Sequence, residues 1–210
     1  MLDFDFYITT PRLAITYFNP NQESHVDFMM RLYGAEEIAA STDSFSMEPL
    51  TREGALKMIN ERAEQIETTG FGRYLVSLLP HPTNETNENQ SQSKLDMVKA
   101  AQLIGLVSLN TRDGAKSSPI PDAGFRILSS QRGKGYATEA LDGLLKYYAQ
   151  EKQVLEVLAY CDPINEPSKA VLRKLGFQEE STVELEAHGL VMNLGQWSRG
   201  LKKGIKDYNQ

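Results

Sequence analysis

The sequence lacks several features, and each absence excludes a class of protein. Cys161 is the single cysteine, which rules out an internal disulfide, and the three histidines, His25, His81 and His188, are too scattered to form a metal-ligand cluster. No apolar run approaches the roughly 20 residues of a membrane span. The chain begins without the basic segment and apolar core of a secretory signal. We therefore expect a cytoplasmic protein without a metal site or a membrane partner.

An excess of basic residues is also missing. Lysine and arginine total 22 against 28 aspartates and glutamates, which gives a net charge of −6 and a pI near 5.2. This balance argues against nucleic acid or an anionic membrane as the main partner. Any anionic ligand must therefore be held by local groups. The length of 210 residues, with 40% apolar and 24% charged, suits one globular domain with ample core.

Hydrophobic periodicity predicts one α+β domain with a mixed sheet. Helical spacing marks residues 24–34, 51–70, 137–148 and 165–176. Apolar or alternating runs predict strands at 12–18, 74–79, 103–109, 122–128 and 154–160, one starting at Phe177, and two closing strands at 182–186 and 190–194. Residues 35–50 show no clear period. We expect a single domain over 1–198 with a mobile polar insert at 80–100, and a loose tail at 199–210.

Residues 128–140 are the most informative stretch, because a strand there meets a helix through two glycines. Gly133 and Gly135 can adopt positive φ, and their backbone N–H groups can turn toward a ligand. Arg132 and Lys134 add two cations, and the helix that follows adds unpaired N–H groups and the positive end of its dipole. The stretch predicts a cradle for an anion such as pyrophosphate. A plain surface turn with solvated charges is the alternative interpretation.

The position of this stretch strengthens the prediction of a ligand site. Strand, helix and strand over 122–160 have the length of a right-handed parallel crossover. The cradle then lies at the carboxyl end of a strand, where open α/β sheets bind ligands. Neither common phosphate loop fits: no Gly-x4-Gly-Lys-Ser/Thr is present, and Thr138 occupies the third glycine's place in Gly-x-Gly-x-x-Gly. Asn165 is a good N-cap for the next helix.

Several segments in order resemble the GNAT superfamily of acyl-CoA-dependent N-acetyltransferases, and most closely its ribosomal-protein N-terminal acetyltransferases. These segments are Gly124-Phe-Arg-Ile, Arg132-Gly-Lys-Gly-Tyr-Ala-Thr-Glu-Ala140, Asn165-Glu-Pro-Ser168 and Lys174-Leu-Gly-Phe177. The resemblance is strong over 120–178. It implies the GNAT acyltransferase fold, with a mixed six- to seven-stranded sheet, about four helices, and a gap between the fourth and fifth strands.

The resemblance also implies acetyl-CoA as co-substrate and assigns residues to it. The fourth strand would bind the pantetheine arm, the glycine loop the pyrophosphate, and the Asn165 helix the pantetheine or adenosine. The residues concerned are Phe125, Ile127, Leu128, Arg132, Gly133, Lys134, Gly135, Tyr136, Ala137, Asn165 and Ser168. Asn165 and Ser168 also have a simpler interpretation as the N-cap and a first-turn residue of that helix.

The sequence departs from the family pattern at two positions. Ser130 stands where the motif usually begins with glutamine or arginine. Leu172 stands where many members carry the tyrosine that protonates the leaving thiolate, so the catalytic residues remain open. The candidates for proton transfer are Tyr160, Cys161, Asp162, Glu48 and His188. Each also has a structural interpretation, such as a core tyrosine or a buried thiol. The resemblance implies that the oxyanion donor lies in the backbone around Ile127 or Leu128.

Three functions are compatible with these features. The first two are direct acetyl transfer in a ternary complex, either to a protein or peptide amine or to a small amine. The third is a non-catalytic acyl-CoA-binding or regulatory domain, which the missing tyrosine makes plausible. We expect an amine acceptor as partner and no nucleic acid. Either a monomer or a homodimer fits the sequence.

Overall fold

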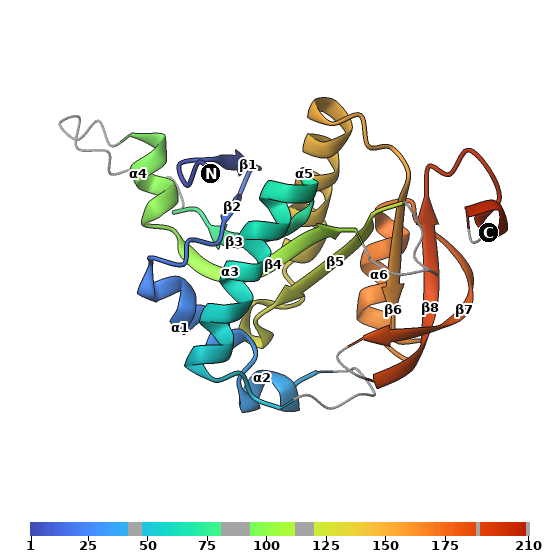
Figure 1. Ribbon diagram of the computed structural model, residues 1–210, viewed down its shortest axis with the longest axis horizontal. Helices are drawn as coiled ribbons and strands as arrows, with labels where there is room; N and C mark the ends of the chain where they lie inside the picture. Colours follow the sequence, from blue (N-terminus) through green and yellow to red (C-terminus); the bar gives the residue numbers. More distant parts are fainter. Residues whose placement is uncertain (42–47, 81–92, 112–119, 188–189, 209–210) are drawn as a thin grey trace.

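A single mixed sheet organises the chain. The computed structural model describes residues 1–41, 48–80, 93–111, 120–187 and 190–208. In this part of the chain the sheet has eight strands in the order β1-β2-β3-β4-β5-β6-β8-β7 (Figure 1). Their bounds are β1 Tyr7–Thr9, β2 Leu13–Tyr17, β3 Gly72–Leu78, β4 Gln102–Asn110, β5 Asp122–Ile127, β6 Val157–Cys161, β7 Gln178–Ala187 and β8 Leu190–Arg199. Every neighbouring pair is antiparallel except β5 and β6.

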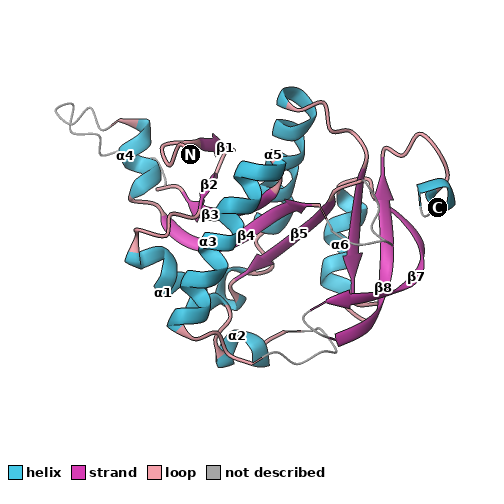
Figure 2. Ribbon diagram, in the orientation of Figure 1, coloured by secondary structure: helices cyan, strands magenta, loops and turns pink. Residues whose placement is uncertain are grey.

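Helices cover both faces of this sheet (Figure 2). The described helices are α1 Glu23–Leu32, α2 Ala35–Ala39, α3 Arg52–Thr69, α4 Lys94–Lys99, α5 Tyr136–Glu151 and α6 Glu166–Lys174. One core joins α5 and α6 to the sheet through side chains such as Leu141, Leu144 and Leu172. A second core joins α1 and α3 to the other face and includes Met29 and Ile59. No described helix is both long and apolar enough to span a bilayer.

The predicted fold class is confirmed, and the described sheet has one strand more than the six to seven that the resemblance implies. The strands predicted from Phe177 and at 182–186 form one strand, β7, whereas β1 was not predicted. Strand β1 is only three residues long, too short to show alternation. The helices α2 and α4 are also short, and α4 lies within the predicted insert at 80–100. Residues 81–92 of that insert lie outside the described residues. The tail contains a 3₁₀ turn, Ile205–Tyr208, whose Tyr208 hydroxyl donates to Glu156.

Local signals placed the long elements correctly. Thr51 caps α3 by accepting from the Gly54 N–H at 3.1 Å, and Asn165 caps α6 by accepting from the Ser168 N–H at 3.0 Å. Strand β6 begins at Val157, three residues later than the predicted strand at 154–160, and the chain turns before it at Gln153, with φ 56°. The capping residues Thr51 and Asn165 therefore predicted the starts of their helices more accurately than the apolar run predicted the start of β6.

The stability of the fold depends on pH through His25. Burial lowers its pKa from 6.5 to about 4, and its Nδ1 accepts the Asn19 N–H at 2.9 Å, which requires an unprotonated nitrogen. Because the folded pKa is depressed, the unfolded state binds more protons between these two values. The stability contribution is therefore full above pH 6.5 and is lost as the pH falls toward 4.

We expect wild type to lose about 1–2 kcal/mol more stability than His25→Asn between pH 7 and pH 4.5. A shift of one pKa unit corresponds to about 1.4 kcal/mol, and solvent at the half-buried ring screens part of the effect. Asparagine keeps an acceptor for the Asn19 N–H and does not titrate in this range. Urea unfolding at both pH values measures the difference, and equal pH dependence in the two proteins would contradict it.

Candidate active site

The candidate site begins where the parallel strands β5 and β6 part. They pair only at Asp122 with Leu158 and Ala123 with Ala159. Beyond these pairs β5 continues along β4 to Ile127, while β6 continues along β8 to Cys161. The two ribbons diverge toward their carboxyl ends (Figure 1). Within the described part of the chain, the carboxyl half of β5 thus presents backbone groups that β6 does not satisfy.

The register shows which backbone groups of β5 face this gap. The Leu128 N–H donates to the carbonyl of Ile104 in β4, at a distance of 2.9 Å. Because direction alternates along a strand, the N–H groups of Phe125 and Ile127 point to the other side, toward β6. Of the two predicted oxyanion donors, Ile127 therefore keeps an N–H without a ladder partner, whereas that of Leu128 is used within the sheet.

The predicted cradle follows β5 and has the expected backbone conformation. Gly133 and Gly135 have φ of 76° and 81°, in the left-handed region that favours glycine. A Cβ on Gly133 would meet no protein atom within 4 Å, so the space beside it is open. Within the described part of the chain, the N–H groups of residues 133–138 donate to no protein acceptor. Tyr136 and Ala137 open α5 and contribute two of these groups. The arrangement suits an anion.

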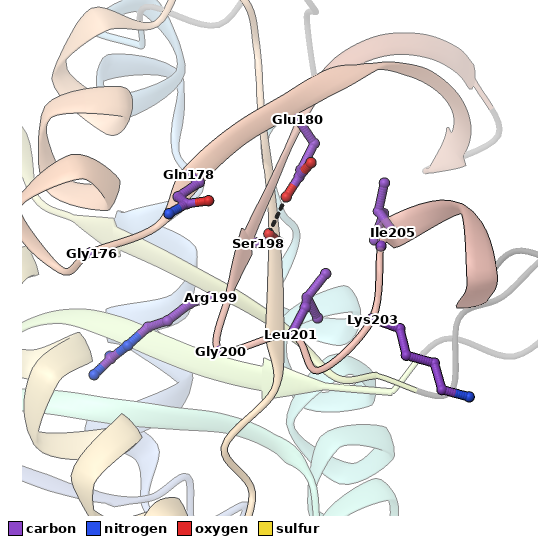
Figure 3. Close-up of a pocket in the computed structure, with 10 residues that line it drawn as sticks. Gly176, Gln178, Glu180, Ser198, Arg199, Gly200, Leu201, Lys203 and Ile205 are labelled. Carbon is purple, nitrogen blue, oxygen red and sulfur yellow. Dashed lines mark hydrogen bonds between the residues drawn. The ribbon is translucent and has the colours of Figure 1, made fainter.

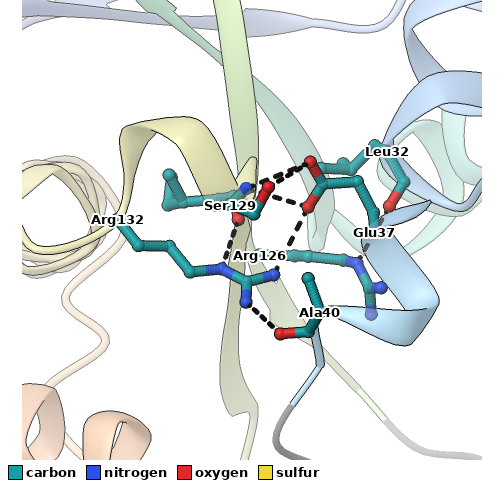
Figure 4. A network of polar contacts seen from close by, with 7 residues as sticks. Leu32, Glu37, Ala40, Arg126, Ser129 and Arg132 are labelled. Atoms are coloured by element: carbon teal, nitrogen blue, oxygen red, sulfur yellow. Dashed lines mark hydrogen bonds and ion pairs between the residues drawn. The ribbon is translucent and has the colours of Figure 1, made fainter.

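Arg132 attaches this loop to α2 (Figure 4). Its guanidinium donates to the Ile127 carbonyl at 3.1 Å and the Ala40 carbonyl at 2.6 Å, and pairs with Glu37 at 3.4 Å. Glu37, only 7% exposed, also accepts from the N–H and hydroxyl of Ser129 at 2.8 and 2.9 Å. The guanidinium predicted to bind phosphate thus fastens the loop to α2, and its proposed ligand contact stays a prediction.

Lys134, the second predicted cation, lies on the exposed side of the loop. Its Nζ donates to the Ser130 carbonyl at 3.1 Å and to Oε1 of Gln131 at 2.9 Å. Both acceptors belong to the short turn before the glycines. The ammonium group can exchange these exposed contacts for an anion at little cost.

Arg12 reaches the cradle from the turn between β1 and β2, and sequence reasoning missed it. Its Nε donates to Glu139 at 2.6 Å, its Nη1 to the Lys134 carbonyl at 3.1 Å, and its guanidinium lies 4.6 Å from the Tyr136 ring centre. Thr10 also donates to Glu139, at 2.6 Å. These contacts join residues more than 120 positions apart, so no local pattern predicts them.

Glu139 is ionised in this environment. Burial alone would raise its pKa, but hydrogen bonds from Thr10 and Arg12 and the charge of Arg12 hold the pKa below its ordinary value. The carboxylate lies in the first turn of α5, directly after the cradle. A negative charge therefore stands close to the groups that would receive an anion.

The second helix predicted to contact the cofactor, α6, follows β6 on the same face as α5. Asn165 is 7% exposed and caps the helix, and the Ser168 N–H is its donor. Their predicted cofactor contacts stay predictions. Leu172, where many relatives carry a tyrosine, is 2% exposed and packs in the core.

The candidates for proton transfer lie in very different surroundings. Tyr160 and Cys161 end β6, opposite the part of β5 that has moved away. The Tyr160 hydroxyl accepts from Nε2 of Gln196 on β8 at 3.2 Å. Cys161 is buried in the core between the sheet and α5, and burial raises the pKa of its thiol to about 11. A thiol with that pKa stays protonated at neutral pH.

The remaining candidates are less well placed or lie elsewhere. Asp162 is 4% exposed, and its Oδ1 accepts the Ile164 N–H at 3.0 Å, the turn-shaping role expected of it. Glu48 is exposed on the segment leading to α3. His188 lies outside the described residues.

Two surface cavities lie away from these residues. The first has a volume of about 370 Å³ and lies between the start of β7, the end of β8 and the first residues of the tail (Figure 3). Its lining includes Glu180, Ser198 and Arg199. The second, about 340 Å³, lies beside Tyr17, Tyr74 and Tyr147. Neither is lined by β5 or by the glycine loop.

Comparisons with known proteins agree with this geometry. Residues 16–178 match the family model described as an acetyltransferase (GNAT) domain. The uncharacterized N-acetyltransferase YnaD of Bacillus subtilis (strain 168) is 34% identical over 59 residues, which are 28% of this chain. That match spans only about a third of the relative, 35% of its length.

Solved structures of ribosomal-protein acetyltransferases share the fold. The ribosomal L7/L12 alpha-N-protein acetyltransferase RimL in complex with coenzyme A aligns with a TM-score of 0.66 at 16% identity, covering 93% of this chain and 98% of that one. The ribosomal-protein-S5-alanine acetyltransferase from Vibrio fischeri aligns with a TM-score of 0.66 at 16% identity, covering 95% and 98%.

The fold and the parted strands define an acyltransferase architecture of the kind that the sequence resembles. The family model covers more than half of the chain, and the chain belongs to the GNAT acetyltransferase family. The resemblance recognised in the sequence is therefore confirmed, and acetyl-CoA is the co-substrate of this family. The open space at Gly133 and the unused N–H groups of residues 133–138 fit its pyrophosphate.

Proposed function

We propose that the protein transfers an acetyl group from acetyl-CoA to a primary amine, by direct attack in a ternary complex. The observation that carries this proposal is the juxtaposition of two features at one end of β5. Within the described residues, a run of N–H groups without a protein acceptor at 133–138 follows a strand whose N–H groups at Phe125 and Ile127 point away from β4 and have no strand partner. The first suits a pyrophosphate and the second an amide-containing arm such as pantetheine.

The same geometry supports the chemistry of acyl transfer. A neutral amine attacks the thioester carbonyl carbon, so that a C–N bond forms and the C–S bond breaks. The ammonium formed loses a proton, and the departing thiolate takes one up. The Ile127 N–H faces the gap and can stabilise the oxyanion that develops on the carbonyl oxygen. The protein's contribution is then orientation, one hydrogen-bond donor and proton transfer.

Among the three leading candidates for proton transfer, we favour Tyr160. Tyr160 lies near the end of β6, a strand that borders the gap, and its hydroxyl accepts a hydrogen bond from Gln196. Cys161 is buried with a raised pKa, and Glu48 is exposed on another segment. The structural neighbours include enzymes whose names state ribosomal proteins as acceptors. A protein or peptide N-terminus is therefore the first acceptor class to try, with small amines second.

The proposal predicts saturable acetyl-CoA binding and amine-dependent release of free CoA thiol. Acetyl-CoA should raise the melting temperature, since a ligand that binds only the folded state stabilises it. Thiol release should be measured with a panel of peptides with free N-termini and of small amines, and mass spectrometry should locate the acetyl group. Acetyl-CoA binding without transfer to any amine would instead favour the non-catalytic alternative. Absence of binding would overturn both.

A further inference from the structure

The two cations that the sequence places beside the glycines have other partners in the structure. The Arg132 guanidinium is held by two carbonyls and Glu37, and Lys134 Nζ by Ser130 and Gln131. Meanwhile the ionised Glu139 places a negative charge one turn into α5. Lys134 can exchange its exposed contacts for an anion, but the charge of Glu139 would still oppose that anion unless a further cation offsets it.

Arg12 supplies that cation. It pairs with Glu139 through Nε and with the Lys134 carbonyl through Nη1. Its Nη2 has no hydrogen-bond partner within the described part of the chain. Nη2 also lies 3.4 Å from the position that a Cβ on Gly135 would occupy. The guanidinium thus uses Nε for Glu139 and Nη1 for the loop backbone, and keeps Nη2 available as a donor.

A cation–π contact helps to hold this side chain in place. The guanidinium lies over the Tyr136 ring at 4.6 Å from its centre, in the first turn of α5. This contact does not use up the hydrogen-bond donors of the guanidinium. The Arg12 side chain is 47% exposed, so a ligand can reach it, whereas that of Glu139 is only 15% exposed.

We propose that Arg12 completes the cradle, with Nη2 donating to a phosphate oxygen of bound CoA and Glu139 holding the guanidinium in place. The inference rests on the proposed function, because it assumes that CoA is the anion. It assigns a ligand contact to the turn between β1 and β2, which the motif at 132–140 does not include. It also explains how an acidic residue can stand beside a phosphate site.

The first test compares Arg12→Gln with Arg52→Gln by isothermal titration with CoA and with pantetheine, which lacks the phosphates. Arg52 is a matched control, since it is 54% exposed and pairs with Glu23 and Asp27 on another surface. Loss of one charge-assisted bond of about 1.5 kcal/mol corresponds to about a tenfold change. We expect Arg12→Gln to weaken CoA about tenfold and leave pantetheine within twofold. Arg52→Gln should change neither.

The second test separates a phosphate contact from a change in loop shape. In the Arg12→Gln protein the Glu139 carboxylate loses its ion pair and keeps only neutral donors, so adding Glu139→Gln should recover part of the lost CoA affinity. Raising the salt concentration should weaken CoA less in Arg12→Gln than in wild type, because one ion contact is gone. Thermal unfolding of each variant verifies that the comparison concerns folded protein.

The outcomes distinguish this inference from the proposed function. If wild type binds CoA and Arg12→Gln binds it within twofold of wild type, the role of Arg12 is overturned while the proposed function stands. Equal loss of CoA and pantetheine affinity in Arg12→Gln would also overturn the phosphate contact. If wild type does not bind CoA, the proposed function fails and this inference fails with it.

Discussion

Replacing Gly133 with valine is expected to weaken CoA binding by about 10²-fold. The Cβ would enter the open space beside the N–H groups of residues 133–138, and the φ of 76° is unfavourable for a branched side chain. Blocking two charge-assisted bonds of about 1.5 kcal/mol each amounts to about 3 kcal/mol, or roughly two powers of ten. Isothermal titration with CoA measures the loss.

Gly70 provides the matched control for this substitution. It has φ of 75° and open space for a Cβ, but it caps α3. A side chain in the left-handed region costs roughly 1–2 kcal/mol at either position, so both variants should lose similar thermal stability. Only Gly133→Val should lose CoA affinity. Gly135 is less suitable, because its Cβ would also touch Arg12. Equal CoA affinity in Gly133→Val and Gly70→Val would show that the cradle is not the CoA-binding site.

Tyr160→Phe is expected to lower kcat by about 10²-fold and leave the KM for acetyl-CoA nearly unchanged. Phenylalanine keeps the ring but removes the hydroxyl, which accepts from Gln196 on β8 and belongs to the strand that borders the gap. General acid–base catalysis contributes about 10²–10⁴-fold, and solvent can replace part of it. Steady-state kinetics with an amine accepted by the wild type measures both constants.

A second tyrosine controls for loss of a hydroxyl in general. Tyr147 lies near the end of α5, packed against Phe6, and borders neither β6 nor the glycine loop. Tyr147→Phe should keep wild-type kcat. If kcat of Tyr160→Phe stays within threefold of wild type, Tyr160 is not the proton-transfer group. The pH profile of kcat then indicates the class of the group that is.

Local chemistry in the sequence was enough to predict the framework of the site. The positive φ of Gly133 and Gly135 and the cap at Asn165 follow from the residue types themselves. The parallel crossover from β5 to β6 follows from the length of the segment between them. Each of these features depends on neighbouring residues and on steric limits, which the sequence displays directly.

The direction of the long charged side chains could not be predicted in the same way. Arg132 stands beside the glycines, yet its guanidinium turns to Glu37 on α2, a helix of five residues without a visible period. Arg12 reaches the cradle from 127 positions before Glu139. A guanidinium on a flexible stem selects its partner from whatever tertiary packing brings near. Proximity in sequence therefore did not reveal the contacts of Arg132 with α2 or the approach of Arg12, and the predicted ligand contact of Arg132 stays a prediction.

The fastening of the glycine loop by Arg132 affects the entropy of ligand binding. Arg132 ties the loop to the Ile127 carbonyl, the Ala40 carbonyl and Glu37, and these contacts within the protein set the shape of the loop. A preorganised receptor loses little conformational freedom on binding, and more of the contact energy then appears as affinity. In the proposed function, Arg132 therefore strengthens anion binding through its contacts within the protein, because the loop has little conformational entropy left to lose.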